Sequence, residues 1–364
     1  SEWQLLQAKT YFELRQYEEA MKCLRSQESP NALLLLSLCY RDGYRDLGQF
    51  CKLAEEALAR GANLVSLGPI HASLYNAYLE LSNMEKAAQH LYEAFMAKAD
   101  LKAENLLWLA DTYYNQLLEE EGNFVIAARA AALYSKVKAT EQATCRLAKV
   151  YSILGRIDDA IALLEPLSNP SQEAQLILAE NYAKKGIVDQ AVQIFDAIVS
   201  ACGTGRSPVA AAAALHGVRL KRAQEKPNWA EIATQLKSLV LQKNFEGEPL
   251  YLEAALEYVE VVAKGDPVKT IALLQKTKAD FEQRGDLLAK DYHAAREQFP
   301  RKNITYQGYM KLIDAQLALN EAKVDRVHQK DLQAKSKTLL LQIMETPIAS
   351  CLKERVQKLL SDET

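Results

Sequence analysis

Two successive copies of one pattern, shifted by 31 residues from Tyr151 to Tyr182, constrain the fold of this chain more than any other feature. A large residue, an alanine, a tyrosine, a glycine, a second alanine and a large residue recur at the same offsets. These positions are Leu147, Ala148, Tyr151, Gly155, Ala160 and Leu164, then Leu178, Ala179, Tyr182, Gly186, Ala191 and Phe195. Because a unit this short cannot bury its apolar side chains alone, the pattern predicts a solenoid of stacked units.

Each copy is expected to form a helix, a tight turn and a second helix. Ala148 and Tyr151 lie three residues apart on one face of the first helix, and Ala160 lies on the facing side of the second. Alanine at the contact lets two helix axes approach to about 8–10 Å, and larger side chains fill the space one turn away. The intervening Gly155 is expected to end the first helix in the left-handed conformation.

This arrangement resembles the tetratricopeptide repeat, a helix pair of about 34 residues. The resemblance implies an all-α fold, a right-handed superhelical α-solenoid of about eight helix pairs with capping helices at its C-terminal end. The packing positions that match the family pattern are Ala8, Tyr11, Ala20, Tyr78, Ala87, Ala110, Tyr113, Ala148, Tyr151, Ala160, Ala179, Tyr182 and Ala191.

The repeat pattern divides the chain into a repeat region, residues 1–280, and a C-terminal helical extension, residues 281–364. The units expected in the repeat region are 1–28, 30–64, 68–100, 103–138, 141–168, 172–200, 208–240 and 249–280. A solenoid must cover its last apolar face. We therefore interpret the extension as a cap, with an interface to another protein as the alternative.

Within the extension, the apolar residues from Tyr306 to Leu317 predict one long helix that runs to about Ile343. Thr346 and Pro347 have the residue types of a helix cap and a first helical position. They predict a final helix with an apolar face of Ile348, Leu352, Val356 and Leu359.

Composition is that of a folded protein, because 25% of the residues are charged and 49% are hydrophobic. The net charge is −3, and neither half is basic enough to predict nucleic-acid binding. No apolar run approaches the roughly 20 residues of a membrane-spanning helix. The 6 cysteines lack metal-site spacing and are expected to be reduced, which predicts a cytoplasmic location. An exported protein with its signal peptide removed is the alternative.

No motif for catalysis, a metal or a cofactor emerges from the sequence. The histidines His71, His90, His216, His293 and His328 are spread along the chain, so we expect them to be isolated and to bind no metal. Residues 203–207 lack the Gly-Lys-Ser/Thr ending of a phosphate-binding loop. The basic residues Arg219, Lys221, Arg222 and Lys226 are interpreted as a solvated helix face rather than a nucleic-acid site.

The resemblance also implies a concave groove lined by the first helices of the pairs, which can hold a peptide or a partner helix. Carried onto this chain, the lining positions are Asn76, Glu80, Asp111, Asn115, Arg146, Lys149, Glu180 and Lys184. Some family members grip a C-terminal carboxylate with a Lys and Asn clamp. Asp111 stands where that clamp would need Asn, so this chain is not expected to bind in that way.

We therefore expect a non-enzymatic scaffold or adaptor that binds a protein or peptide partner, with no cofactor and no nucleic acid. Two alternatives stay open. One is a structural subunit of a larger complex, docked through its C-terminal helices. The other is an accessory domain of an enzyme whose catalytic segment lies outside residues 1–364.

Overall fold

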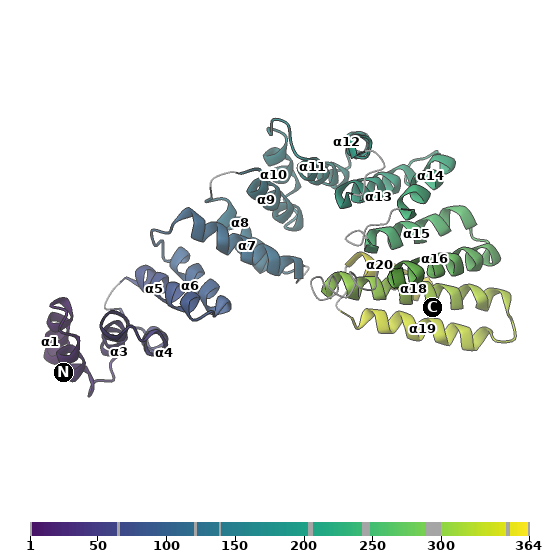
Figure 1. Ribbon diagram of the computed structural model, residues 1–364. Coiled ribbons are helices and arrows are strands. Elements are labelled where there is room, and N and C mark those ends of the chain that lie inside the picture. The colour runs from purple at the N-terminus through teal and green to yellow at the C-terminus, as the bar shows by residue number, and fades with distance from the viewer. Residues whose placement is uncertain are drawn as a thin grey trace. The chain divides into compact units, whose positions relative to one another are not determined.

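A computed structural model describes residues 2–63, 66–119, 122–137, 140–202, 207–241, 248–287, 300–346 and 350–362. All regular secondary structure in these ranges is helical (Figure 1). The chain divides into two compact units, Ser1–Ala143 and Thr144–Thr364, and α9 (Glu141–Ile153) contains the division. The predicted all-α helical-repeat fold is confirmed.

The first unit is a series of helix pairs. Its elements are α1 (Glu2–Glu13), α2 (Tyr17–Leu24), α3 (Pro30–Cys39), the π-helical turn η1 (Tyr40–Tyr44), α4 (Leu47–Ala59), α5 (Leu67–Glu80), α6 (Met84–Met96), α7 (Ala103–Glu119) and α8 (Phe124–Tyr134). The helices pack as α1 with α2, α3 with α4, α5 with α6 and α7 with α8. Residue 119 ends an unusually long first helix, and the acidic residues 120–121 that follow it lie outside the described part.

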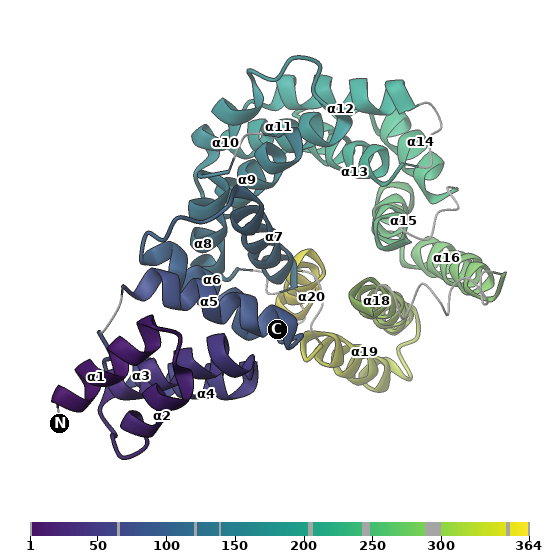
Figure 2. The ribbon, with the colours of Figure 1, turned by 60° about the vertical axis from the view of Figure 1, so that its left-hand side comes forward.

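The second unit continues the same construction after α9. Its further helices are α10 (Ile157–Leu164), α11 (Gln172–Lys185), α12 (Val188–Cys202), α13 (Pro208–Arg222), α14 (Trp229–Val240), α15 (Glu248–Ala263), α16 (Pro267–Leu287), α18 (Pro300–Val324), α19 (Gln329–Met344) and α20 (Ser350–Asp362). In this unit, α11, α13 and α15 lie on the inner side of a curved row of pairs, and α12, α14 and α16 lie on its outer side (Figure 2).

The small packing positions are closed to solvent. The alanines at these positions are each 0% exposed: Ala8, Ala20, Ala87, Ala110, Ala148, Ala160, Ala179 and Ala191. Tyr78 and Tyr113 are buried, whereas Tyr11, Tyr151 and Tyr182 are half-buried. Ala191 shares its apolar cluster with Phe195 of the same helix and with Ala213 of the next pair. Each pair thus buries part of its apolar surface against the next pair.

The turns inside several pairs share a backbone geometry. Gly155 and Gly186 have φ values of 74° and 85°, in the left-handed region. After Gly155, the N–H of Arg156 donates to the carbonyl of the repeat tyrosine, Tyr151, at 2.8 Å. Ser82 takes the same left-handed position at φ 57°, so other pairs tolerate a residue with a side chain there. The carbonyl of the repeat tyrosine therefore accepts the hydrogen bond that caps the first helix. The same tyrosine lies next to the packed alanine in the repeat pattern.

The C-terminal helices cover the end of the second unit. α18 packs on α15 and α16, and one apolar cluster extends from Ala211 of α13 to Val356 of α20. Leu352 and Val356 are each 0% exposed, as the predicted final helix requires. The Pro347 and Ile348 positions of that prediction lie outside the described residues. α16 runs through residue 280. The predicted boundary at residues 280–281 therefore marks where the repeat pattern ends in the sequence, and it does not mark the end of a helix.

The prediction of one helix from Tyr306 to Ile343 is wrong. α18 ends at Val324 and α19 begins at Gln329. The Asp325 carboxylate accepts the backbone N–H groups of Val327 at 2.9 Å and His328 at 3.2 Å, which supports the reversal of the chain. The two helices then pack against each other, with Leu340 and Ile343 of α19 fully buried.

Replacing a packing alanine with leucine should separate a helix pair. Ala160→Leu and Ala191→Leu each insert three carbons into a site with no exposed surface, and we expect a loss of about 1–3 kcal/mol in unfolding free energy. The matched controls, Ala162→Leu and Ala197→Leu, add the same atoms at exposed positions of the same helices. Urea denaturation followed by circular dichroism measures the difference. Equal midpoints for buried and exposed substitutions would contradict this packing.

Candidate functional site

The predicted groove residues lie on first helices, in two groups. In the first unit, Asn76 and Glu80 of α5 and Asn115 of α7 are exposed, whereas Asp111 of α7 is half-buried. The Tyr134 hydroxyl donates to the Asp111 carboxylate at 2.6 Å. Asp111 is therefore engaged within its own helix pair, and the three exposed residues are the accessible part of this face.

In the second unit the predicted residues lie on α9 and α11, and several of them bind side chains of a neighbouring first helix. Lys149 forms an ion pair with Glu173 of α11 at 2.9 Å. Lys184 of α11 donates to the Ser152 hydroxyl of α9 at 2.6 Å. The Glu180 carboxylate lies 3.5 Å from the Nε2 of His216 on α13. Arg146 is half-buried. These side chains tie neighbouring first helices together while Lys184 stays exposed.

Beyond α11 the first-helix face is less exposed. No residue of α13 is exposed, and on α15 the carboxylates of Glu253 and Glu257 are buried, with 7% and 4% of their residues' surface exposed. α20 lies on this inner side and contacts α18 and α19 (Figure 2). In the described part of the chain, the first-helix face is thus more exposed on α5 and α7 than on α13, and the sequence pattern did not reveal this difference.

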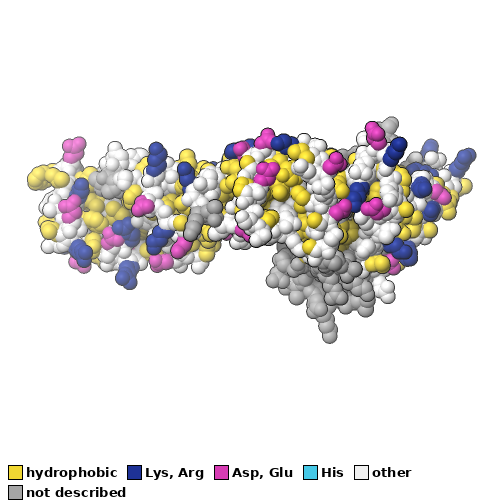
Figure 3. Space-filling view, turned by 90° about the horizontal axis from the view of Figure 1, so that it is seen from above, with side chains coloured by type: hydrophobic (Ala, Val, Ile, Leu, Met, Phe, Trp, Pro, Cys, Tyr) yellow, Lys and Arg dark blue, Asp and Glu magenta, His cyan; other side chains and the backbone are white. Residues whose placement is uncertain are grey.

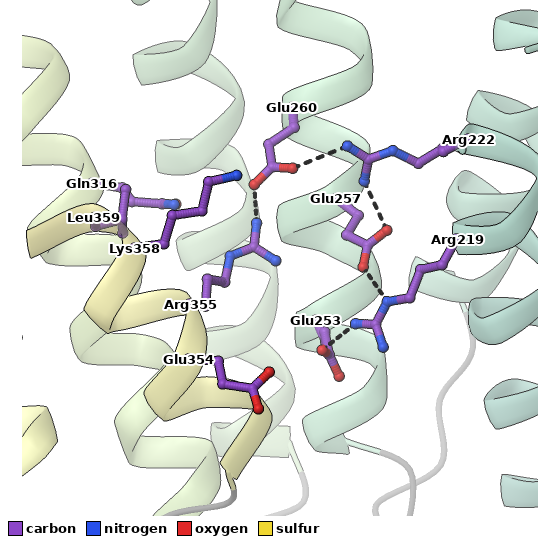
Figure 4. A pocket seen from close by; sticks show the side chains of 10 residues that line it. All are labelled: Arg219, Arg222, Glu253, Glu257, Glu260, Gln316, Glu354, Arg355, Lys358 and Leu359. Carbon is purple, nitrogen blue, oxygen red and sulfur yellow. Dashed lines mark hydrogen bonds and ion pairs between the residues drawn. The ribbon is translucent and has the colours of Figure 1, made fainter. Parts of the chain in front are cut away.

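Between α20 and the first helices α13 and α15 lies a cavity of about 590 Å³. It is lined from four helices, α13, α15, α18 and α20 (Figure 4). Its lining residues are Arg219, Arg222, Glu253, Glu257, Glu260, Gln316, Glu354, Arg355, Lys358 and Leu359. We call it the α20 pocket.

A ladder of ion pairs forms one wall of the α20 pocket. The Arg219 guanidinium bonds to Glu253 and, at 2.7 Å, to Glu257. Glu257 also accepts from Arg222 at 2.9 Å. Arg222 reaches Glu260, which in turn pairs with Arg355 of α20. The ladder thereby links α13, α15 and α20, and it gives both buried glutamates the partners that a buried charge requires.

Burial alone lowers the pKa of the Arg219 guanidinium, but the charges of Glu253 and Glu257 outweigh burial and hold the pKa above its ordinary value. Lys221, on another side of α13, pairs with Asp196 at 2.9 Å and Glu231 at 3.2 Å. The interpretation of this basic run as a solvated face is therefore wrong for these residues, because carboxylates on neighbouring helices neutralise them. On the face in Figure 3, basic and acidic side chains are likewise interspersed.

A second polar cluster joins two helix pairs of the first unit. Glu55 of α4 accepts hydrogen bonds from the Tyr78 hydroxyl at 2.7 Å and from Lys86 at 2.8 Å. The Nε2 of His90 lies 3.2 Å from the same carboxylate, and the Nδ1 of His90 lies 3.0 Å from the Nδ1 of His71. Burial raises the pKa of Glu55, but hydrogen bonds from Lys86, Tyr78 and His90 outweigh burial and hold it below its ordinary value.

The expectation that the histidines are isolated is wrong for His71 and His90. The sequence did carry one signal, because His90 follows Ala87 by three residues and therefore shares its packed face. Within the described residues, no group of three or more His, Cys, Asp or Glu side chains could hold a metal ion. His293 lies outside the described part. The Glu55 cluster joins α4 to the α5 and α6 pair through hydrogen bonds and an ion pair.

The described cysteines and helices carry little further chemistry. Cys23, Cys39, Cys51 and Cys145 are free thiols, and burial raises the pKa of Cys39 to about 12. A thiol so hard to ionise is a poor nucleophile. No helix in the described ranges combines the length and apolar character needed to cross a membrane.

The His71 and His90 contact predicts acid sensitivity. Burial and the neighbouring His90 lower the pKa of His71 below its ordinary value of 6.5, although Glu93 acts in the opposite direction. The folded chain therefore binds fewer protons than the unfolded chain, so stability present above pH 6.5 is lost as the pH falls below it. We expect the urea midpoint to fall between pH 7.5 and 5.5, and to fall less in His71→Gln.

The matched control is His328→Gln. Asp325 raises the pKa of exposed His328 through a hydrogen bond, so this histidine contributes stability at low pH and its loss cannot reduce acid sensitivity. An acid response that is as large in His71→Gln as in the wild type would contradict the role of the His71 contact.

Comparisons with known proteins give fold likeness without a family. No family model and no curated protein matches this chain. A signal-transduction ATPase with a tetratricopeptide repeat sensor, from Pyrococcus horikoshii, is 16% identical with a TM-score of 0.40; the match covers 79% of this chain and 48% of that protein. This chain thus spans about half the length of the archaeal protein.

Two eukaryotic structures are similar at the same level. Human IFIT1, as a dimer with PPP-AAAA, is 15% identical with a TM-score of 0.40, covering 98% of this chain and 79% of that one. Yeast Tom70 is 13% identical with a TM-score of 0.34, covering 93% and 83%. The likeness concerns the fold, and the helix pairs of this chain themselves identify that fold as tetratricopeptide-like.

Proposed function

We propose that this protein is a non-enzymatic scaffold that binds a protein or peptide partner on the open first-helix face of its earlier helix pairs. The observation that carries the proposal is the contrast along that face. Asn76, Glu80 and Asn115 stay exposed on α5 and α7, whereas α13 has no exposed residue and two glutamates of α15 are buried. A surface left open on repeated, rigid elements is available to a partner.

The chemistry of the open face favours a protein over a uniformly charged ligand. Amide and acidic side chains are both present on it in the first unit: Asn76, Glu80 and Asn115. Mixed polar groups suit the backbone amides and varied side chains of a peptide, whereas a polyanion would meet the glutamate. The close helix packing beneath also keeps the face ordered before binding, which reduces the entropy lost on association.

The described C-terminal helices give less support to docking in a larger complex through residues 281–364. The apolar residues that would form such an interface, including Ile313, Leu340 and Leu352, are fully buried inside the second unit. Among the described residues of α18, α19, α20 and the turn before α19, the large apolar side chains that are exposed are Val324, Val327 and Leu341. Such single residues are ordinary on a protein surface.

Site-specific photo-crosslinking in cells that make this protein tests the proposal. A photoreactive residue at Asn76 of α5 or Asn115 of α7 should capture the same polypeptide. The matched controls carry the residue at Ala132 of α8 or Gln193 of α12, which are also exposed but lie on second helices. We expect at least a fivefold higher yield from the first-helix positions. Equal yields from both helix faces, or a crosslink to RNA in place of protein, would contradict the proposal.

A further inference from the structure

The α20 pocket contains two charged side chains that the ion-pair ladder does not use. Glu354 and Lys358 lie one helical turn apart on α20, on either side of Arg355 (Figure 4). Arg355 forms an ion pair with Glu260. Within the described part of the chain, neither Glu354 nor Lys358 forms an ion pair or a side-chain hydrogen bond, and both are exposed.

The charges lining the pocket exclude simple ligands. Its bases are Arg219, Arg222, Arg355 and Lys358, and its acids are Glu253, Glu257, Glu260 and Glu354. A phosphate or other polyanion would approach Lys358 but also meet carboxylates along the opposite wall, and a polycation would meet the arginines. A ligand with one charge of each sign, suitably separated, can instead satisfy both unused groups without disturbing the ladder.

The spacing of the two groups suggests what that ligand is. Positions four residues apart on a helix are displaced by about 6 Å along its axis. In an extended peptide, side chains two positions apart point to the same side and are separated by about 6.5–7 Å. The cavity volume of about 590 Å³ falls within the range of ligand-binding pockets.

We propose that the α20 pocket binds an extended peptide segment with one acidic and one basic side chain two positions apart. The acidic side chain pairs with Lys358 and the basic side chain with Glu354. The Gln316 amide of α18, which also lines the pocket, is available to the peptide backbone. This inference rests on the proposed peptide-binding function and adds a second, sequence-selective contact to it.

Fluorescence anisotropy with the full chain tests the proposal. The probes are labelled peptides blocked at both ends, with the cores Glu-Ala-Lys, Lys-Ala-Glu, Glu-Ala-Glu and Lys-Ala-Lys. One of the two mixed-charge orders should bind best, since α20 has a fixed direction, and both like-charged peptides should bind at least tenfold more weakly. The double variant Glu354→Lys/Lys358→Glu should reverse the preference between the two mixed orders.

The variants are chosen to separate binding from folding. Glu354 and Lys358 are exposed and lie outside the ladder, so their exchange should leave the helical circular dichroism unchanged. Lys353→Gln, on the same helix but outside the pocket, is the matched control and should bind as the wild type does. The proposal is overturned if no peptide binds, if like-charged peptides bind equally well, or if the exchanged variant keeps the original preference.

Failure here is distinct from failure of the proposed function. Crosslinks from Asn76 and Asn115 report on the open first-helix face, and peptide binding reports on the α20 pocket. If the crosslinks succeed while the peptides fail, only the pocket assignment falls.

Discussion

Close approach of paired helices at buried alanines is the constraint on which this structure depends. Ala148 and Ala160 in one pair, and Ala179 and Ala191 in the next, have no exposed surface. A larger side chain at these points would hold the helices apart, and the apolar residues one turn away would lose their contacts. Because each apolar cluster also takes side chains from the following pair, as Ala213 shows, one close contact supports the next.

Polar interactions join particular helices of this stack to one another. Glu55 fastens α4 to the α5 and α6 pair through Tyr78 and Lys86. The ladder from Arg219 to Arg355 does the same for α13, α15 and α20. In the second case, the ion pairs also form one wall of the α20 pocket. Buried charges of this kind add little net stability, but they specify which helices lie together.

The helix pairs could be predicted from sequence because their determinants are local. Alanine, tyrosine and glycine recur at fixed offsets within about 30 residues, and the left-handed turn at Gly155 follows from the glycine itself. The end of α18 at Val324 could not be predicted in this way. A continuous apolar face fits one long helix as well as two antiparallel ones, and the turn between them shows in the sequence only through Asp325, whose carboxylate accepts the Val327 N–H.

The site residues were harder to predict, because contacts between neighbouring pairs decide them. Arg219 meets Glu253 from 34 residues away, and Arg355 meets Glu260 from 95 residues away. The repeat period places a residue on a helix face but does not say whether a later helix covers that face. The groove positions were therefore assigned on α5, α7, α9 and α11 by repeat position alone, which could not show that Asp111, Lys149 and Glu180 meet side chains of other helices.

Hydrogen exchange of Ala191→Leu, measured by mass spectrometry, tests most directly whether this chain is a stack of pairs that depend only on their neighbours. The account predicts faster exchange in α11, α12 and α13, which share the cluster around Ala191, and unchanged exchange in α3 to α6 of the first unit. A uniform increase over the whole chain, or no increase around residue 191, would contradict it.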